Sequence, residues 1–351
     1  MNNEAQDNRE PKSASDLFLS PELSKADSVL AVVLNWNAAR ETIECLASIL
    51  NSSYAALDIV IVDNGSDEAV VQEIAGGMRQ TKRRSHVRLA RDPFGPPVSA
   101  GDLLLLRVDD NEGFAGGMNH ALRRAMKWGY GWVLLVNNDC RISPNLVADL
   151  LGAASVRPRA GIVGCKVLDA AADEAVLFGA GRMMFELGAH LFWRTSSATG
   201  TIRVNFVTFA VAFISVAMLR DVGLLEERFF MYVEDVQLCY RAAKRGWQLF
   251  VDLDVAVHHA RSTSLGNRSP GYYYYVTRNT LMFIRDEMPM VQRLVSMMAF
   301  LLETTLRWAF FLVRRQRTHA RAVWLGAAHF TSGYSGRAPL ELHGSAPPQR
   351  T

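Results

Sequence analysis

An acidic pair, Glu234-Asp235, is the feature of this sequence that points most directly to chemistry. The pair follows the aromatic residues of 229–232 and stands at the start of a segment with helical spacing. Aromatic neighbours lower the local dielectric and adjacent like charges repel, and both effects raise the pKa of a carboxyl group toward the range of a general base. A helix N-terminus opposes part of this rise, and acidic residues also occupy first helical turns for the dipole alone. The pair therefore needs support from other features.

The elements that would position such a pair follow an alternating pattern. Short apolar runs predict strands at 29–34, 58–62, 103–108 and 132–136, and helical spacing predicts helices at 41–50, 70–78 and 115–127. Alternating strands and helices are typical of a parallel α/β sheet. The basic, proline-bearing residues 79–100 are expected to form an exposed loop. A further helix is expected to open at Pro144 with Ser143 as its cap.

Polar residues collect where each of the four expected strands ends. They lie at 35–37, 63–66, 111–119 and 137–139, in the order of the strands. Asn, Asp and Gly favour turns, so each cluster alone could be ordinary turn chemistry. In parallel sheets, however, ligands bind beyond the carboxyl ends of the strands. Four clusters at one edge of a sheet therefore predict a shared ligand site.

Two of these clusters suggest a diphosphate and a metal. The glycine-rich residues 111–119 lead into a helix, where a diphosphate could lie, although a tight loop entry explains the glycines equally well. They form neither a dinucleotide fingerprint nor a P-loop. Asp139 could hold Mg²⁺ or Mn²⁺ together with substrate phosphates, or be an ordinary turn residue. A neutral imidazole of His258 or His259 could join it on Mn²⁺, and only one of the two can face a given site of a strand. A structural histidine is the alternative.

The order of these motifs resembles that of family 2 glycosyltransferases, and more narrowly the bacterial rhamnosyltransferase-like branch that builds surface polysaccharides. The resemblance spans about residues 28 to 290 and includes Arg278-Asn279. It is carried by Val32-Val33-Leu34-Asn35-Trp36-Asn37, Val62-Asp63-Asn64-Gly65-Ser66, Asn111-x-Gly113-Phe114-Ala115-Gly116-Gly117-x-Asn119, Asn137-Asn138-Asp139, Phe229-Phe230-x-x-x-Glu234-Asp235-x-x-Leu238-x-x-Arg241 and His258-His259.

The resemblance implies a GT-A fold, with a mostly parallel central sheet flanked by helices, and an inverting transfer from a nucleoside diphosphate sugar. Asp235 would be the general base that deprotonates the acceptor hydroxyl, and Glu234 would orient the acceptor. The donor would be bound by residues from the four polar clusters: Asn35, Trp36, Asn37, Asp63, Asn64, Gly65, Asn111, Gly113, Phe114, Gly116, Gly117, Asn119, Asn137 and Asn138.

The same resemblance implies a site for Mn²⁺ or Mg²⁺. Asn137-Asn138-Asp139 occupies the place of the family's Asp-x-Asp, and Asp139 keeps the carboxylate expected to bind the metal, whereas Asn137 lacks the first one. His258 is the better candidate for the second ligand. His259 and Arg278 are second choices for a metal or phosphate contact. Bulky residues in 206–213 and Gln237 depart from the family pattern, so the resemblance says least about the acceptor.

Composition limits the remaining possibilities. The 351 residues are 49% hydrophobic, which supports a sizeable core, and the net charge of +3 does not suggest a nucleic-acid partner. The four cysteines have no paired spacing and are expected to be reduced. Residues 1–27 are polar and predict a disordered leader, and residues 28–288 are expected to form the GT-A domain. Its nucleotide-binding half would be 28–140 and its acceptor-binding half 141–288.

Residues 289–351 are expected to form a C-terminal helical extension that associates with a membrane. The segment 290–313 is strongly apolar but interrupted by Arg293, Glu303 and Arg307, and basic residues follow it. This pattern predicts an amphipathic helix in the membrane interface rather than a spanning helix. A core or dimer helix is the alternative. The protein is accordingly expected in the cytoplasm, peripheral on the inner face of the cell membrane, with a homodimer possible.

The sequence thus predicts a metal-dependent inverting glycosyltransferase that acts on a growing, lipid-linked glycan. The hypothesis for the donor is dTDP-rhamnose, with a UDP-sugar such as UDP-galactofuranose or a UDP-hexose as the alternative. A nucleotidyltransferase would carry a basic glycine-rich signature near its first strand, and residues 35–40 do not match it. A nucleotide-sugar-binding scaffold that has lost catalysis is the alternative from another class.

Overall fold

The computed structural model describes residues 25–81, 86–91, 95, 102–170, 175–178, 183–184, 190–191, 199–260 and 269–339. The predicted leader lies outside the described residues, apart from a short 3-10 helix, η2 (Lys25–Asp27). Residues 340–351 of the predicted C-terminal tail also lie outside them.

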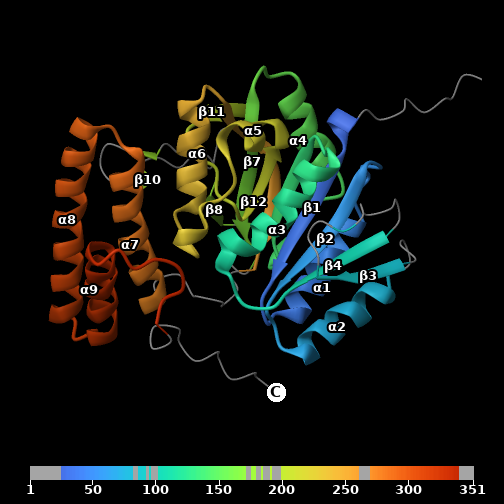
Figure 1. Cartoon of the computed structure of the whole chain (residues 1–351). Helices are drawn as coiled ribbons and strands as arrows, with labels where there is room; N and C mark the ends of the chain where they lie inside the picture. The colour runs from blue at the N-terminus through green and yellow to red at the C-terminus, as the bar shows by residue number, and fades with distance from the viewer. Residues whose placement is uncertain are drawn as a thin grey trace, which may run out of the picture.

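A parallel sheet forms from the first half of the chain, as the apolar runs predict. β1 (Val29–Asn35), β2 (Leu57–Asn64), β4 (Asp102–Val108) and β5 (Trp132–Asn137) lie side by side in the order β5-β1-β2-β4, all parallel. They are connected through α1 (Ala39–Leu50), α2 (Glu68–Arg79) and α3 (Gly113–Trp128) (Figure 1). Their central residues are fully buried, because helices cover both faces of the sheet. The four predicted polar clusters therefore do end at one edge.

Two sequence-based expectations in this half are wrong. Residues 79–100 contain an edge strand, β3 (His86–Ala90), which pairs in parallel with β4 and keeps Leu89 exposed. An edge strand needs apolar residues on one face only, so its pattern is weak in the sequence. α4 (Leu146–Ser155) begins beyond Pro144, and the Ser143 carbonyl accepts the Leu146 amide in the turn before it. Ser143 is therefore not the cap of this helix.

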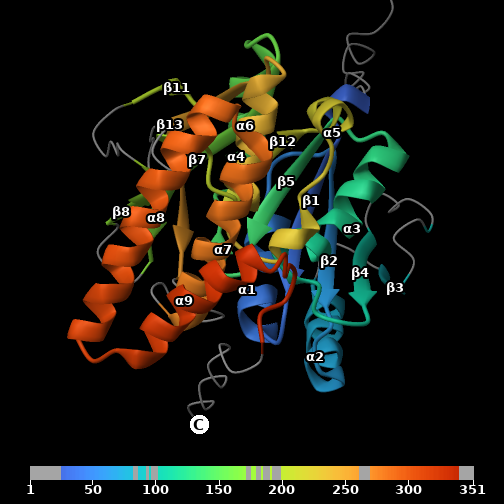
Figure 2. The same cartoon turned by 60° about the vertical axis from the view of Figure 1, so that its left-hand side comes forward.

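The second half of the chain extends the sheet beyond β5. β12 (Val211–Ser215) pairs antiparallel with β5 and with β7 (Ala160–Asp169), and β13 (Gln248–His259) pairs in parallel with β7. β11 (Thr201–Val204) lies outside β13. Shorter elements complete this half: β6 (Cys140–Arg141) on β13, β8 (Val176–Phe178) on β7, the pair β9 (Met183–Met184) and β10 (His190–Leu191), α5 (Val216–Val222), η4 (Glu227–Phe229) and α6 (Glu234–Lys244). Figure 2 shows β8, α5 and α6 beside the longer strands.

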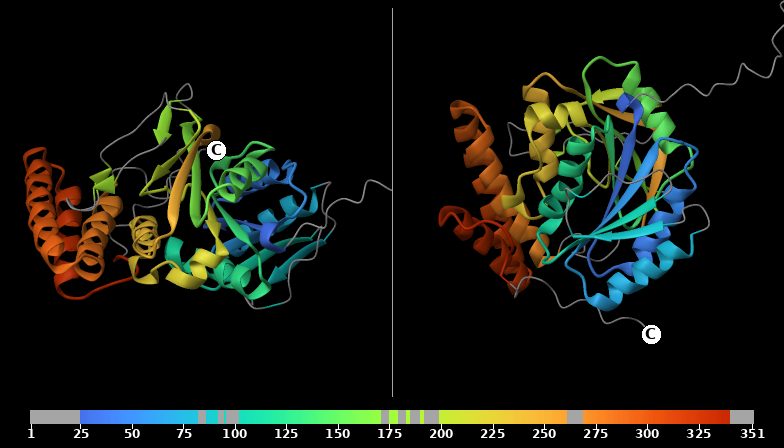
Figure 3. Two further views of the ribbon diagram at one scale, coloured as in Figure 1. Left: turned by 90° about the horizontal axis from the view of Figure 1, so that it is seen from above. Right: turned by 45° about the vertical axis from the view of Figure 1, so that its right-hand side comes forward.

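Three helices follow the sheet: α7 (Pro270–Glu287), α8 (Met290–Val313) and α9 (Arg317–Thr331). They stand together at one end of the molecule, and α6 lies between α7 and the strands (Figure 3). The side chain of Ser269 caps α7 by accepting the Tyr272 amide. The predicted mostly parallel central sheet with flanking helices and a C-terminal helical extension is confirmed.

Candidate active site

The acidic pair opens α6 and is preceded by a strained loop. Phe230, Tyr232 and Val233 have φ of 64°, 65° and 75°. Left-handed backbone is costly for any residue with a Cβ, and most costly for a β-branched one. Such outliers persist only where the surroundings hold them, and they gather at functional sites. The backbone just before Glu234-Asp235 thus supports the prediction of a functional site here independently of the carboxylates.

The two carboxyl groups have different surroundings. Burial raises the pKa of Asp235 to about 6, and the backbone amides of Val236 and Phe209 oppose the rise. The Val236 amide lies 2.7 Å from Asp235 Oδ1. Burial, and then the charge of Asp235, raise the pKa of Glu234 well above its usual range, and its Oε2 has no hydrogen-bond partner among the described residues. Because hydrogen bonds to the ionised form favour it, the charge of the pair resides on Asp235.

A short backbone segment joins the acidic pair to the end of β5. The Phe209 backbone amide lies near enough to the Asp235 carboxylate to lower its pKa. The next carbonyl, that of Ala210, accepts the Asn137 amide at 2.9 Å and the Cys140 thiol at 3.6 Å. Asp235 is therefore connected to Asn137 and Cys140, which are distant in sequence, through the backbone of Phe209 and Ala210. The predicted base and the predicted metal-binding turn belong to one site.

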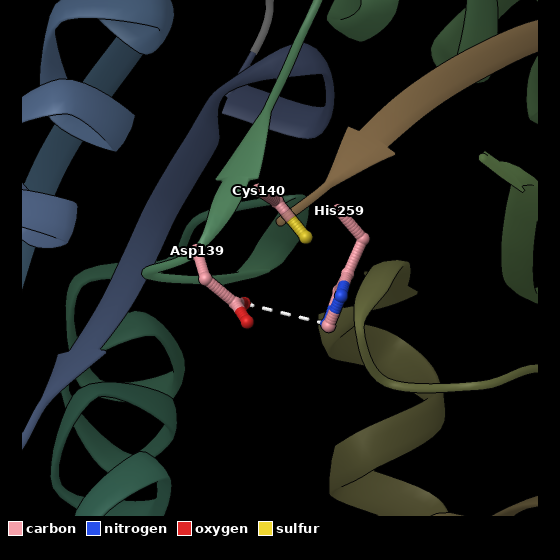
Figure 4. A group of neighbouring side chains, drawn as sticks. All are labelled: Asp139, Cys140 and His259. Atoms are coloured by element: carbon pink, nitrogen blue, oxygen red, sulfur yellow. Dashed lines mark ion pairs between the residues drawn. The ribbon is translucent and has the colours of Figure 1, made fainter. Parts of the chain in front are cut away.

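Asp139 meets His259, which corrects the preference for His258. Asp139 is buried, and its Oδ1 lies 3.3 Å from His259 Nε2 (Figure 4). The pairing of β6 with β13 places Cys140 opposite His259 and Arg141 opposite His258. A register irregularity lies in β13 between Asp252 and Ala256. A bulge shifts the alternation of side chains along a strand, so sequence could not decide which histidine faces Asp139.

The Asp139–His259 pair fits a divalent cation. Asp139, Cys140 and His259 offer ligand atoms that all lie within 4.8 Å of one another. His259 Nδ1 is buried and without a hydrogen-bond partner in the described part of the chain. Burial raises the pKa of the Cys140 thiol, which donates to a backbone carbonyl instead. The remaining oxygen and nitrogen donors suit Mn²⁺ better than Mg²⁺, which prefers oxygen alone.

The predicted donor residues are brought together, largely by bonds to one another. The Asn35 amide donates to Asp63 Oδ1 at 2.8 Å and to Ser66 Oγ at 3.0 Å, which joins the loops after β1 and β2. The Asn64 amide donates to Asn111 Oδ1 at 3.1 Å and to the Gly113 carbonyl at 2.9 Å, which adds the loop after β4. The expected shared edge is thus a hydrogen-bonded rim.

Only part of this rim can touch a ligand. Several predicted donor residues are buried: Asn35, Asp63, Asn64, Gly113, Gly116, Gly117 and Asn119. Asn119, for example, binds the backbone of Leu225 and the side chain of Glu227. The side-chain amides of Asn35, Asn64 and Asn119 are thus used within the protein, and these residues shape the rim. The predicted donor residues that remain at least partly exposed are Trp36, Asn37, Gly65, Asn111, Phe114, Asn137 and Asn138.

Arg278 is not a phosphate contact, which corrects the second-choice prediction. It is fully buried, and its guanidinium donates to carbonyl and side-chain oxygens of the protein. The sequence also did not indicate that Phe209 and Ala210 lie between the acidic pair and the turn after β5. Their backbone groups make these bonds, and backbone groups carry no signal of residue type.

Comparison with known proteins supports the same reading. Residues 26–269 match the family described as Glycosyltransferase like family 2. The chain is 26% identical over 259 residues to the N-acetylglucosaminyl-diphospho-decaprenol L-rhamnosyltransferase of Mycobacterium tuberculosis, covering 69% of this chain and 78% of that one.

Two solved structures share the fold at low identity. A mannosyltransferase from Pyrobaculum calidifontis, in complex with GDP-Man and Mn²⁺, aligns with a TM-score of 0.53 and 14% identity over 86% of each chain. S. aureus TarS in complex with UDP-GlcNAc aligns with a TM-score of 0.53 and 15% identity, over 88% of this chain and 89% of that one. The chain is a glycosyltransferase of the GT-A fold and belongs to the family described as Glycosyltransferase like family 2.

Proposed function

We propose that this protein is an inverting glycosyltransferase that moves rhamnose from dTDP-rhamnose to a hydroxyl of a growing, lipid-linked bacterial surface glycan. The observation that supports the proposal most is the segment Phe209–Ala210, whose Phe209 amide lowers the pKa of Asp235 and whose Ala210 carbonyl accepts the Asn137 amide and the Cys140 thiol on either side of Asp139 in sequence. The rhamnosyl donor and lipid-linked acceptor are suggested by the name of the mycobacterial relative.

The residues divide the chemistry between them. Asp139 and His259 would hold a divalent cation, which neutralises the charge of the leaving diphosphate when bound. Asp235 takes the proton of the acceptor hydroxyl, and a pKa of about 6 keeps it ionised yet basic at neutral pH. The hydroxyl oxygen bonds to the anomeric carbon as the bond to the diphosphate breaks, and attack from the opposite face inverts the configuration. Glu234 would contact the acceptor through its unpaired Oε2.

The donor side of the site is proposed from the exposed part of the rim. Trp36, Asn37 and Asn111 would face the nucleoside, with Phe114 and the turn at Asn137-Asn138 nearer the diphosphate. A UDP-sugar is the alternative donor, because a related fold is solved with UDP-GlcNAc.

The membrane is the proposed partner of α8. This helix is long and apolar enough to cross a membrane, and most of its surface is not buried by the protein. Ser296, Phe300, Thr304 and Phe311 face the protein. Apolar side chains dominate the exposed surface of this helix: Met290, Val291, Leu294, Val295, Met298, Leu301, Leu302, Leu306, Trp308, Phe310, Leu312 and Val313.

The charges within α8 are neutralised or tethered, whereas the basic side chains at its end are exposed, with the Arg314 guanidinium over the Phe310 ring. Arg307 pairs with Glu303, and Arg293 donates to the Met288 carbonyl at 2.9 Å. Exposed Arg314, Arg315 and Arg317 follow the helix. An apolar face with a basic end suits an anionic membrane surface. On this proposal residues 28–288 are the catalytic region, with halves that divide near 140, and 289–351 hold it at the inner face of the cell membrane.

A nucleotide panel tests the donor site first. Purified protein is melted with dTDP, UDP, GDP and CDP, each with and without Mn²⁺, because a ligand that binds the folded state raises its melting temperature. A shift with dTDP that Mn²⁺ enlarges supports the proposal, and a shift with UDP alone selects the alternative donor. No shift with any nucleotide at millimolar concentration would count heavily against the transferase proposal. Turnover of dTDP-rhamnose with a lipid-linked N-acetylglucosamine acceptor then tests the transfer itself.

A further inference from the structure

The loop before the acidic pair needs an external support. Phe230, Tyr232 and Val233 all have positive φ, and none is a glycine. A chain of ordinary residues does not hold three such conformations within four positions by itself, because each is unfavourable for a residue with a Cβ. The first helical turn that carries Asp235 begins directly after this loop. The support for the loop is therefore also the support for Asp235.

Asn279, on α7, binds three backbone carbonyls in or next to this loop. Its Nδ2 lies 2.9 Å from the Phe229 carbonyl, 2.8 Å from the Met231 carbonyl and 2.9 Å from the Tyr232 carbonyl. Asn279 is fully buried. A single amide thus gathers three carbonyls whose convergence requires the left-handed backbone of this loop.

Arg278, beside it, is fully buried with every N–H donor used. Nε donates to Asn279 Oδ1 at 3.0 Å, and so fixes the amide that binds the loop. Nη2 donates to the Phe229 carbonyl at 3.1 Å and to the Arg228 carbonyl at 3.5 Å. Nη1 donates to the Tyr274 hydroxyl at 3.1 Å and to the Gly336 carbonyl at 2.8 Å. A guanidinium has five N–H donors, so no other side chain could replace this set.

A segment beyond α9 closes the arrangement from the other side. The Gly336 amide donates to the Arg228 carbonyl at 2.8 Å, and the Ala338 amide donates to the Tyr275 hydroxyl at 2.8 Å. The Tyr275 ring in turn stacks on Phe230, with centroids 5.5 Å apart. We call residues 336–338 the strap. The strap binds the same loop that Arg278 and Asn279 bind.

The opposite flank of the loop rests on the donor side of the site. The Ala115 amide, in the first turn of α3, lies 3.4 Å from the Phe230 carbonyl. The loop is thus held between the glycine-rich rim and α7. Small movements of α7 or the strap would move the acidic pair relative to the donor.

We propose that Arg278, Asn279 and the strap form a positioning unit that fixes loop 228–233, and through it the Asp235 carboxylate, for proton transfer. The unit touches no reacting atom on this reading, so its residues are positioning residues. The proposal rests on Asp235 being the base of the proposed function. It also gives the C-terminal segment a part in catalysis that is separate from membrane binding.

The test compares three variants of the full chain. Arg278→Lys keeps the charge but removes the planar fork, Tyr275→Phe keeps the ring but removes the acceptor of the Ala338 amide, and Arg285→Lys is the control. Arg285 lies on the same helix with its guanidinium paired to Asp286 at 2.6 Å. The readouts are kcat and KM for the sugar donor, affinity for dTDP with Mn²⁺, and amide hydrogen exchange of residues 226–236.

Displacement of a reacting group by about 1 Å can cost about 100-fold, so Arg278→Lys should lower kcat roughly 100-fold. Tyr275→Phe should lower kcat by about tenfold or less, as loss of one hydrogen bond predicts. Donor KM and dTDP affinity should stay within about twofold, because the rim of the donor site is intact. Exchange in 226–236 should accelerate in both variants and not in Arg285→Lys.

Unchanged exchange and unchanged kcat in Arg278→Lys would overturn the positioning unit. Equal losses of kcat and of dTDP affinity would also overturn it, since they indicate general unfolding. If Arg278→Lys does not fold, Tyr275→Phe decides by the same readouts. Failure of the proposed function looks different: the wild-type protein then turns over no sugar donor, while the exchange experiment still reports whether the unit holds the loop.

Discussion

Asp235 and Glu234 are neighbours in the chain, yet their chemistry differs because their contacts differ. Asp235 accepts the Val236 amide, and this amide and that of Phe209 both favour its ionised form. Glu234 has a buried oxygen without a partner among the described residues. The two carboxyl groups at one helix start thereby differ in pKa. Asp235 ionises more readily, and Glu234 retains its proton more readily.

Replacing Asp235 by Asn should abolish most turnover while donor binding persists. General-base catalysis contributes about 100- to 10,000-fold, so kcat for Asp235→Asn should fall within that range. The affinity for dTDP with Mn²⁺ should be unchanged in calorimetry. Asp221→Asn is the matched control, because Asp221 is an acidic partner of Arg245 and Trp247 on another helix. Full activity of Asp235→Asn would assign the base elsewhere.

The pH dependence follows from the raised pKa of Asp235. Since the group must be ionised to accept a proton, log(kcat/KM) should fall with unit slope below about pH 6. An acid limb near pH 4, the ordinary range of an exposed aspartate, would contradict this burial effect. The profile is measured at saturating Mn²⁺ so that loss of metal does not mimic it.

The same shift affects stability in the opposite sense. Between about pH 4 and pH 6 the folded state keeps a proton that the unfolded chain has released, so the free energy of unfolding falls as pH rises through this window. Asp235→Asn carries no charge to bury and should be more stable than wild type at pH 8, by roughly 1 kcal/mol or more. The difference should vanish below pH 4. Urea denaturation at the two pH values measures it, and equal stability at pH 8 would count against a buried charge.

The two histidines give a direct test of the metal site. His259→Ala and Asp139→Asn should each weaken the Mn²⁺ enhancement of nucleotide binding by roughly 10- to 100-fold. His258→Ala should not, because His258 lies opposite Arg141 in the β6/β13 pairing. The melting-temperature shift with dTDP, titrated with Mn²⁺, separates the three variants. If only His258→Ala lost the Mn²⁺ enhancement of nucleotide binding, His258 rather than His259 would be the metal ligand.

At the scale of elements, the first turn of α3 and the loop before α6 are built as one contact. Gly113 has φ of 77°, and a Cβ there would lie 2.2 Å from the Phe230 carbonyl oxygen. Only glycine allows the two backbones to approach this closely. The close contact joins the donor rim to the loop that carries the acidic pair.

Two glycines at the ends of α3, Gly113 at its start and Gly129 just after it, separate crowding from backbone strain. Gly129 has φ of 76°, like Gly113, but a Cβ there would meet nothing within 4 Å. Gly129→Ala should therefore cost only the left-handed backbone, about 1–2 kcal/mol. Gly113→Ala should cost more, roughly 4 kcal/mol, and should also lower kcat, because Phe230 must move. Urea denaturation and turnover assays measure both variants. Equal losses in the free energy of unfolding would show that Phe230 moves away from a Cβ at position 113 with little penalty.

At the scale of the whole molecule, α8 is the outermost element and presents an apolar surface. Its inner face packs on the other C-terminal helices, and its outer face has no partner within the described part of this chain (Figure 1). Exposed apolar area of this extent marks an interaction surface. The basic residues at the end of the helix favour an anionic membrane over a second copy of the chain.

Vesicle flotation tests this surface. The full chain should float with vesicles that contain about one third anionic lipid and less with neutral ones, and the binding should weaken as salt is raised. Leu294→Glu with Leu302→Glu should abolish flotation, whereas Val156→Glu should not, since Val156 is exposed elsewhere in the fold. Flotation of the double variant would assign membrane binding to another surface of the chain. A dimer in solution that the double variant disrupts would replace the membrane with a second copy of the chain.

The sequence by itself determined the order of strands and helices and the edge at which the polar clusters meet. Buried parallel strands are continuous apolar runs, and their carboxyl ends must lie on one side because the strands share a direction. The acidic pair after an aromatic run could be identified for the same kind of reason. Burial by neighbouring aromatic residues is a local property of the chain.

The tertiary structure alone decided which side chains face the site. A register irregularity lies in β13, and His259 rather than His258 faces Asp139. Arg278 is buried and donates to the backbone of the loop before α6 instead of facing a ligand. Asn35 belongs to a motif expected to bind the sugar donor, but its side-chain amide donates to Asp63 and Ser66 and so connects two loops. These outcomes depend on strand register and on long-range hydrogen bonds, whose partners are set by three-dimensional packing and not by the residue type or its neighbours in sequence.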